Sequence, residues 1–416
     1  MSGTEERATR VGPMAGVRVV EATMFAFAPA AGAVLADWGA DVIKLEHPVA
    51  GDPARGVDAY GVKPSDHGIG YIYEVSNRNK RAVGLDLSTE AGHEVLMRLI
   101  DGADVFICSF MAPARRKLGI DVDDVRGRNP RIVYARATGH GPEGPDADKG
   151  GFDGVSYWAR SGVSIQAMTP GDNEYPALLP GPGFGDIQSG AHLAGGIAAA
   201  LFQRERTGEG AVVDVSLLGS GLWAMQMSLT GTHLVGRDAL AQRDRKRPPN
   251  PIWSVYRTSD HRYVALSMIQ SDRYWPGWCR AFGREDLIEH PRYATAALRQ
   301  ENIEDCVAEV EDAFGKRTLD ECRAALASQD GAWSVVNRPV DALTDPQAEA
   351  NDYVQWVDLD EEGRRFPLVP APARIDEVAP VLGRAPGFAA DTDEVLAELG
   401  YTFDELVQMK VDGTIT

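Results

Sequence analysis

The feature that most constrains the fold is an alternation of short β-branched runs with helical segments through the first half of the chain. Helical patterns begin after Pro29, near Ser88 and at Ile187. Strands separated by helices of this length are typical of βαβ units, which build a parallel sheet with helices on its faces. The sequence therefore predicts an α/β fold with a large, mostly parallel sheet. Its expected strands are residues 17–21, 41–46, 105–108, 131–135 and 212–217.

The pattern changes after residue 217, which predicts further domains. A basic, proline-bearing run, RDRKRPPN, precedes a more mixed, aromatic segment. Two proline-marked connections on either side of one small domain indicate a chain that leaves the large domain and returns to it. The predicted divisions are a large α/β domain at 10–217, a connection at 218–250, a smaller α+β domain at 251–340, a returning connection at 341–375 and a C-terminal helical part of the large domain at 376–416.

The charge balance argues against nucleic acid as a partner. The 416 residues carry 61 acidic and 42 basic side chains, which gives a formal net charge of −19. A chain of this sign repels a polyanion, because nucleic-acid binders neutralise phosphates with Lys and Arg. No apolar run approaches the roughly 20 residues that span a bilayer, so no membrane partner is expected either.

The cysteines and the first βα turn limit the choice of cofactor. The four cysteines lie far apart, without the CxxC or Cys/His pairings of zinc sites, so we expect reduced thiols, a cytoplasmic location and no metal. The first turn, ATMFAFAPA, lacks the GxGxxG that lets the backbone approach a pyrophosphate. No nicotinamide or flavin cofactor is therefore expected.

The most informative segment is GPGFGDIQSGAHLAGGIAAALFQRERTGEG, in which Asp186 follows a glycine-rich turn and begins a long helix of small residues. Asp is a common helix N-cap, and the local sequence alone favours that role. The same position also suits a nucleophile, because a carboxylate with an ordinary pKa of about 3.9 is ionised at pH 7 and is stabilised at a helix N-terminus. The residues alone leave both roles open.

Two further groups of polar residues are ambiguous. Asp153 lies in the turn GGFDGVSYWARSG, where an aspartate is either a turn former or a site residue. Basic residues gather in NRNKR (77–81) and in ARRKLG, which contains Arg115, Arg116 and Lys117. Such clusters are solvated faces or, in an acidic chain, a pocket for a phosphorylated ligand.

Taken together, these segments resemble the class III CoA-transferases, a family that includes formyl-CoA transferase, carnitine CoA-transferase and α-methylacyl-CoA racemase. The similarity covers almost the whole chain from Gly16, with several motifs in the same order and spacing. The matching segments are 39–55, 77–87, 103–120, 183–201, 206–218, DPQAEA at 345–350 and APGFAADTDEVLAELGY at 385–401.

The resemblance implies a Rossmann-like large domain that binds coenzyme A and an interlocked homodimer in which each chain passes through the other. It makes Asp186 the nucleophile of an acyl-CoA:carboxylate CoA-transferase, whose substrates are an acyl-CoA donor and a carboxylic acid acceptor. Asp153 matches a supporting acidic residue. The residues that the resemblance assigns to the coenzyme A site are His47, Leu85, Phe110, Arg116, Lys117 and Gly185.

Departures from the family pattern bear on the reaction. Racemases carry a His before the residue that matches Asp153, whereas this chain has Phe152. Oxalate-using members carry Gln where this chain has Ala26, and their glycine-rich lid has no counterpart around residues 248–253. With Phe25, Phe27 and Trp158 as expected neighbours, these differences suggest a larger, less polar acyl group. A racemase-like enzyme and a non-catalytic CoA-binding protein remain as alternatives.

Overall fold

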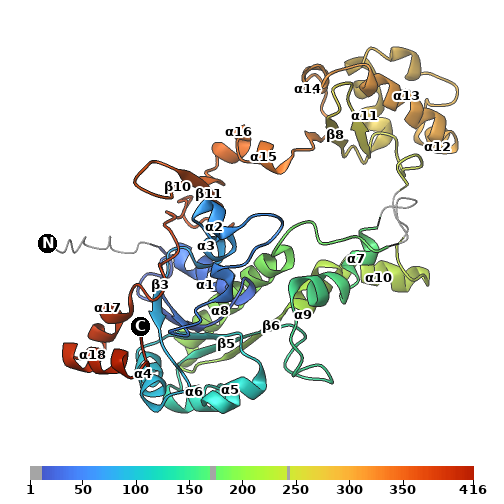
Figure 1. Ribbon diagram of the computed structural model, residues 1–416. Coiled ribbons are helices and arrows are strands. Elements are labelled where there is room, and N and C mark those ends of the chain that lie inside the picture. The colour runs from blue at the N-terminus through green and yellow to red at the C-terminus, as the bar shows by residue number, and fades with distance from the viewer. Residues whose placement is uncertain (1–11, 169–174, 241–243) are drawn as a thin grey trace. The chain divides into compact units, whose positions relative to one another are not determined.

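The computed structural model describes residues 12–168, 175–240 and 244–416, which form two units (Figure 1). The first unit contains the described parts of 12–166, 177–240 and 349–416, and the second contains those of 167–176 and 244–348. Both units are therefore built from separated stretches of the chain.

A six-stranded parallel sheet forms the centre of the first unit, as the sequence predicts. The strand order β3-β2-β1-β4-β5-β6 reverses direction between β1 and β4. In sheets of this order, ligands bind beyond the carboxyl ends of the strands where the order reverses. The strands are β1 (Arg18–Ala22), β2 (Asp41–Glu46), β3 (Arg81–Gly84), β4 (Val105–Cys108), β5 (Val133–Thr138) and β6 (Val212–Ser216).

Both faces of the sheet are buried, which explains the nearly continuous apolar strands. Val19 packs under α1 (Phe27–Asp37) and α8 (Phe184–Thr207) on one face. Its neighbour Val20 packs with α4 (Glu90–Asp101) on the other face, because successive side chains of a strand point to opposite sides. Figure 1 shows α1 and α8 on one side of the sheet and α4 on the other.

The helices α1 and α8 approach each other closely through small residues. A Cβ on Gly190 would lie 2.7 Å from Ala30 Cβ and 2.9 Å from the Phe27 carbonyl oxygen. This contact fixes α8 against the sheet. The helix begins three residues earlier than the sequence suggested, after Gly183 in the left-handed conformation (φ 69°), and ends before Gly208 (φ 78°).

The basic cluster at 77–81 is neither a solvated face nor a phosphate pocket. Arg78 pairs with buried Asp37 at 2.6 Å, and Lys80 pairs with buried Glu21 at 2.7 Å. Arg81 begins β3, a strand that the sequence did not predict, and is itself buried. The cluster thus forms internal ion pairs of the first unit.

The connections predicted at 218–250 and 341–375 contain regular structure. Two helices follow β6, and a β-hairpin lies in the returning segment. After that hairpin, the Ala82 amide donates to Asp391 Oδ2 at 2.8 Å and joins the C-terminal segment to β3. The remaining elements of the first unit are η1 (Pro53–Arg55), α2 (Pro64–His67), α3 (Tyr71–Asn77), α5 (Ala112–Leu118), α6 (Val122–Arg128), the π-helical turn η2 (Asp153–Ala159), α7 (Val163–Gln166), α9 (Leu217–Ala224), α10 (Gln226–Val235), β10 (Gln355–Asp358), β11 (Arg365–Leu368), α17 (Thr392–Glu398) and α18 (Phe403–Val411).

The second unit has its own aromatic core under a three-stranded antiparallel sheet. Trp278 stacks between Trp275 and Phe282, with ring centroids 5.3 and 5.0 Å away. The four cysteines of the chain are all buried and free. The elements of this unit, with α16 at its boundary, are β7 (Val255–Arg257), β8 (Tyr263–Leu266), α11 (Ser271–Ala281), η3 (Glu285–Leu287), α12 (Ala296–Glu301), α13 (Ile303–Gly315), α14 (Leu319–Leu326), β9 (Trp333–Val335), α15 (Pro339–Ala342) and α16 (Pro346–Glu349).

Within the described residues, no helix combines the length and the apolar character needed to cross a membrane.

Candidate active site

Two carboxylates meet at the N-terminus of α8. Asp153, the first residue of η2, accepts hydrogen bonds through Oδ2 from the backbone amides of Gly185 at 2.8 Å and Asp186 at 3.5 Å. Asp153 is only 5% exposed. It therefore takes the capping role that the local sequence suggested for Asp186, which instead lies in the first turn of the helix.

The glycine before Asp186 makes this contact possible. A Cβ on Gly185 would overlap the Tyr157 ring and lie 2.5 Å from Asp153 Oδ1. Only glycine leaves room for the carboxylate of Asp153 to reach the helix amides. The Gly185 amide donates to Asp153, and the contact of Gly185 with coenzyme A stays a prediction.

The electrostatics of the pair favour protonation. Burial and, to a smaller extent, the neighbouring charge of Asp153 together raise the pKa of Asp186 to about 7. Burial also raises the pKa of Asp153, although the two backbone hydrogen bonds oppose this. The sequence argument expected an ordinary ionised carboxylate at position 186. The difference arises because Asp153, and not Asp186, receives the stabilising amides of the helix terminus.

Some buried polar atoms beside the pair lack a hydrogen-bond partner in the described part of the chain. They include Asp153 Oδ1, Ser156 Oγ and Ser189 Oγ. Buried polar atoms are nearly always hydrogen-bonded in folded proteins, so unpaired ones at a site are available to a ligand or to water.

The first βα turn, after β1, borders the same helix terminus. The Met24 amide donates to Ser109 Oγ at 3.2 Å and so connects the turns that follow β1 and β4. The Phe25 amide donates to Asp52 Oδ1 at 3.1 Å. A Cβ on Gly183 would lie 4.0 Å from both Ala26 Cβ and Asp186 Cβ. The carboxylates therefore lie beside the position where the strand order reverses.

A buried ion network supports this turn from within the sheet. Lys44 Nζ lies 2.9 Å from Asp52 Oδ2 and donates to the Thr23 carbonyl oxygen at 3.0 Å. Glu21 pairs with Lys80 close to α1, where a Cβ on Gly32 would overlap Glu21 Oε2. Burial lowers the pKa of Lys80 to about 8, against the opposing effect of Glu21. Sequence reasoning missed Asp52, because its contact with Phe25 crosses between two turns.

Two of the residues expected at a coenzyme A site lie at the ends of neighbouring strands β2 and β3. His47 is exposed, and its Nδ1 accepts from the amides of Val49 and Ala50 at 3.2 Å each. An accepting Nδ1 assigns the proton of the neutral ring to Nε2, which makes Nε2 a donor. Leu85 is 2% exposed and packs in the core, so only its backbone can meet a ligand.

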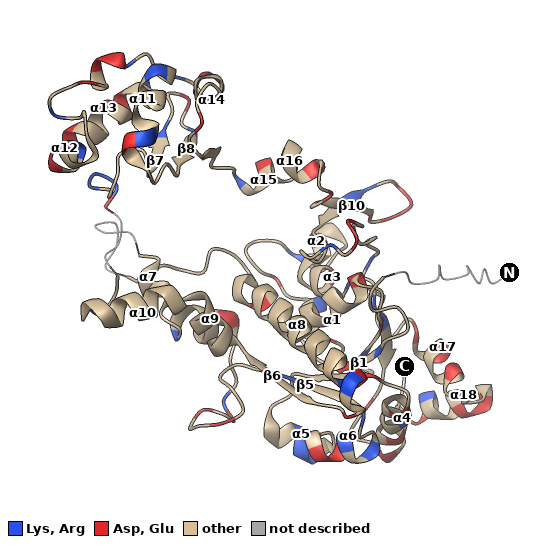
Figure 2. Cartoon of the chain, turned by 180° about the vertical axis from the view of Figure 1, so that it is seen from behind, with Lys and Arg blue, Asp and Glu red and all other residues tan. Residues whose placement is uncertain are grey.

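The other expected residues follow β4. Phe110 is half-buried against the core, and its carbonyl oxygen accepts from Arg115 at 2.7 Å. Arg115 is buried and also pairs with Asp121 at 2.9 Å. Arg116 and Lys117 on α5 are exposed. The basic part of α5 is blue in Figure 2. Of this basic cluster, Arg116 and Lys117 are thus the ones open to an anion.

The aromatic residues expected near an acyl group occupy different places. Phe25 is half-buried and lies edge-to-face on Phe152, with ring centroids 5.4 Å apart. Trp158 is buried and lies edge-to-face on Phe184 at 6.0 Å, two residues before Asp186. Phe27, the first residue of α1, is buried in the core on the face of the sheet that α1 and α8 cover.

The comparison with protein families decides the identity. Residues 14–392 match the model of the family described as CoA-transferase family III. The chain belongs to this family. It is a class III CoA-transferase, and no group of three or more metal-ligating side chains occurs in the part of the enzyme that the structure describes.

Related proteins of known name support this assignment for the transferase. The chain is 33% identical to (R)-2-hydroxy-4-methylpentanoate CoA-transferase of Clostridioides difficile over 95% of its own length and 97% of the relative. It is also 33% identical to cinnamoyl-CoA:phenyllactate CoA-transferase of Clostridium sporogenes, over 96% of each chain. A CAIB/BAIF family protein from Brucella suis has a similar structure, with a TM-score of 0.80 and 27% identity over 93% of this chain and 99% of that one.

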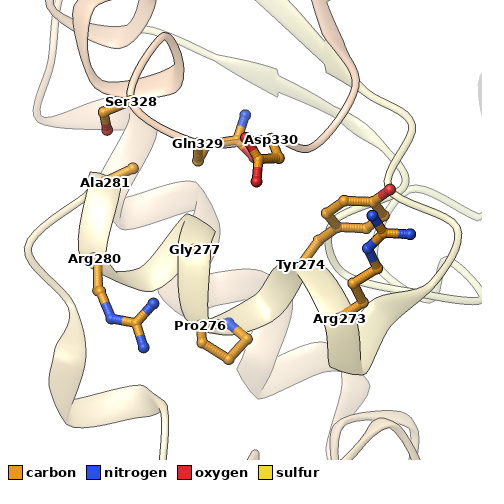
Figure 3. Close-up of a pocket in the computed structure, with 9 residues that line it drawn as sticks. All are labelled: Arg273, Tyr274, Pro276, Gly277, Arg280, Ala281, Ser328, Gln329 and Asp330. Atoms are coloured by element: carbon orange, nitrogen blue, oxygen red, sulfur yellow. The ribbon is translucent and has the colours of Figure 1, made fainter.

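A cavity of about 370 Å³ in the second unit of the transferase does not compete with this site. Its lining residues are Arg273, Tyr274, Pro276, Gly277, Arg280, Ala281, Ser328, Gln329 and Asp330. Figure 3 shows the guanidinium groups of Arg273 and Arg280 at different ends of α11, and both residues are exposed. Since its one carboxylate, Asp330, is exposed and unpaired with a second acid, this cavity offers no activated nucleophile.

Proposed function

We propose that the transferase moves coenzyme A from an acyl-CoA to a carboxylic acid through covalent intermediates on Asp186. The observation that carries the proposal is the carboxylate pair at the N-terminus of α8. Asp186 is half-buried, and burial together with the charge of Asp153 raises its pKa to about 7. A carboxylate of raised pKa is a stronger nucleophile when ionised and remains substantially ionised at neutral pH.

Each step of the mechanism conserves an activated acyl group. The ionised Asp186 attacks the thioester carbonyl, forms an aspartyl mixed anhydride and expels coenzyme A as a thiolate. The thiolate attacks the aspartyl carbonyl of the anhydride, releases the first acid and leaves an aspartyl-CoA thioester. The acceptor carboxylate attacks this thioester, expels the thiolate again and forms a second anhydride. Attack of the thiolate on the acceptor carbonyl yields the new acyl-CoA and regenerates Asp186 without ATP.

Asp153 acts in this scheme as a positioning residue. Its carboxylate holds the amides of Gly185 and Asp186 and so fixes the first turn of α8. Its charge raises the pKa of the nucleophile. Exclusion of water is also required, because a mixed anhydride would otherwise hydrolyse.

We propose that coenzyme A binds along the carboxyl ends of the strands of the sheet. His47 Nε2, Arg116 and Lys117 would contact phosphate oxygens, Phe110 would pack against the adenine, and the Leu85 backbone would line the nucleotide. These residues follow β2, β3 and β4, whose carboxyl ends lie on the same side of the parallel sheet. We further propose an interlocked homodimer in the cytoplasm as the working form.

Covalent labelling tests the nucleophile. The transferase is incubated with an acyl-CoA, treated with hydroxylamine or borohydride, digested and analysed by mass spectrometry. We expect modification at Asp186 in the wild type, and neither modification nor turnover in Asp186→Asn. Turnover by Asp186→Asn, or an unmodified Asp186 peptide with every active acyl-CoA, would overturn the mechanism.

The two alternative functions give different results. A racemase would incorporate solvent deuterium at the α-carbon of a branched acyl-CoA, but Phe152 cannot carry the proton that such chemistry moves. A non-catalytic CoA-binding protein would bind acyl-CoA equally well with Asp186→Ala and transfer nothing in either form.

A further inference from the structure

Exposed apolar side chains lie close in the chain to each carboxylate of the pair, and we call them the apolar rim. Its members flank Asp153 in η2, flank Asp186 in α8, or lie in the turn after β1. Exposed apolar clusters of this kind mark binding sites more often than inert surface. The rim consists of Met24, Phe152, Val155, Phe184 and Ile187.

We infer that the apolar rim receives the side chain of the acyl group, so that the transferase acts on monocarboxylic acids with aryl or branched alkyl side chains. The inference rests on the proposed function, because it assumes that the carboxyl carbon of the substrate reacts at Asp186. The acyl side chain must then lie beside that residue. Phe184 and Ile187 lie close to Asp186 in α8, and Phe152 directly precedes Asp153, whose carboxylate accepts from the Gly185 amide at 2.8 Å.

Phe152 is the central member of the apolar rim. It is 61% exposed although it directly precedes buried Asp153. Its ring lies edge-to-face on Phe25, with an interplanar angle of 88°. Edge-to-face packing gives an aromatic ring a defined orientation and leaves its remaining surface for another apolar group.

The support beneath Phe152 is rigid. Phe25 has a left-handed backbone (φ 63°), a conformation that a non-glycine residue keeps only when its surroundings impose it. The Phe25 amide donates to Asp52, which is ion-paired with buried Lys44. Asp52 and Lys44 therefore hold the Phe25 ring in the place where Phe152 packs on it.

The charge beside Asp186 disfavours a second carboxylate on the substrate. Asp153 is a like charge that helps to raise the pKa of Asp186. Ala26 contributes a methyl group and no side-chain donor at this point. A dicarboxylate such as oxalate would place its free carboxylate near these two acids, which repel it.

Substrate selectivity tests the inference. Four acids, 3-phenylpropanoate, 4-methylpentanoate, acetate and oxalate, are each paired as acceptor with the CoA thioesters of the other three. We expect kcat/KM for the two larger acids to exceed that for acetate and oxalate by roughly tenfold or more. Highest activity with acetate or oxalate would overturn the substrate class and leave the transfer mechanism intact.

Substitutions of Phe152 test whether the substrate selectivity comes from the apolar rim. Phe152→Ala should lower the 3-phenylpropanoate-to-acetate ratio of kcat/KM by roughly tenfold, whereas Phe152→Leu should preserve the preference for 4-methylpentanoate over acetate. The matched control is Phe202→Ala, another exposed phenylalanine, sixteen residues beyond Asp186 in α8. It should keep the wild-type ratio, and thermal melting verifies that each variant is folded.

Two further outcomes distinguish a failure of the substrate inference from a failure of the proposed function. An unchanged ratio in Phe152→Ala overturns the inference and assigns the apolar rim to another occupant, such as a second copy of the chain. If no acid accepts coenzyme A and Asp186 is never labelled, the proposed function itself fails.

Discussion

At the residue scale, the sequence left two roles open for Asp186, helix cap and nucleophile. In the structure Asp153 caps α8, and Asp186 is the proposed nucleophile. Asp153 lies 33 positions before Asp186 and takes the amides at the start of α8. That contact depends on η2 folding back onto α8, and no local pattern in the sequence announces it. The consequence for the chemistry is a nucleophile whose pKa is raised to about 7 by burial and by Asp153.

The pH dependence of turnover follows from this shift. A carboxyl group with a raised pKa is protonated below that pKa, so the reactive anion of Asp186 appears as the pH rises through about 7. We expect kcat to increase about tenfold between pH 6 and pH 8, as the ionised fraction does for one titrating group. Steady-state rates over pH 5.5–8.5 measure this rising limb of the pH profile of kcat.

Asp153→Asn provides the decisive comparison. It removes the charge that helps to raise the pKa of Asp186, so the rising limb should move to lower pH. Asp148→Asn, at an exposed position in the preceding loop, should leave the limb where it is. A flat profile between pH 6 and 8, or an unshifted limb in Asp153→Asn, would contradict this electrostatic account.

Residue roles were harder to predict than residue locations. The resemblance directed attention to Asp186 and Asp153, and the structure brings them together. Phe25 was expected nearby, but neither its left-handed backbone nor its contact with Asp52 follows from composition or spacing. Phe27 was expected as a neighbour of the acyl group. It is buried in the core, and its contact with the acyl group stays a prediction.

At the element scale, burial decided which strands were predictable. The bounds of β2 and β4 agree with the sequence analysis: β4 is a fully buried apolar run, and β2 has buried apolar residues at Val42, Ile43 and Leu45. The strand β3 was missed because Arg81 and the preceding Lys80 resemble a solvated segment, whereas both are buried in ion pairs. Ion pairing across the fold is invisible to a local hydropathy pattern.

Alanine substitutions at two glycines of α8 should have opposite effects on the free energy of unfolding. Gly185→Ala would force a Cβ into the Tyr157 ring and against Asp153. We expect a loss of about 1–3 kcal/mol in unfolding free energy from overpacking. Turnover should fall roughly 100-fold, because Asp153 can no longer hold the first turn of α8 in the reactive geometry.

Gly195→Ala is the matched control in the same helix. A Cβ at Gly195 would meet no atom within 4 Å. Alanine is the better helix former, so this variant should gain about 0.5–1 kcal/mol and keep its activity. Urea denaturation and turnover measure both variants. Equal effects of the two substitutions would show that the loss comes from helix propensity or general perturbation and not from the contact with Asp153.

At the scale of the whole molecule, some helices are mainly acidic and others mainly basic. Acidic side chains predominate on α17 and α18, whereas α5 carries only basic charges, in Arg115, Arg116 and Lys117 (Figure 2). The net charge of −19 argues against a polyanion as partner, but a smaller anion such as coenzyme A needs only a few local cations. Overall charge thus bears on the class of partner, and the sheet topology indicates where a ligand is expected.

The helices α9 and α10 leave an apolar surface uncovered on the first unit. No residue of α10 is buried, and Met227 is 85% exposed. Exposed apolar side chains that gather on one surface commonly mark an interface between subunits. The exposed apolar residues of these helices are Leu222, Trp223, Met227, Leu229, Leu234 and Val235. They support the proposed homodimer, in which a second copy covers them.

An interlocked dimer should differ from an ordinary dimer in the exchange of its subunits. Light scattering should give twice the chain mass of 44.9 kDa. Two interlocked chains cannot separate without unfolding, so tagged and untagged dimers mixed after purification should form no mixed dimers over several days. Coexpression of the two forms is the control and should yield mixed dimers. Exchange of subunits under native conditions would show that the chains associate by surface contact alone.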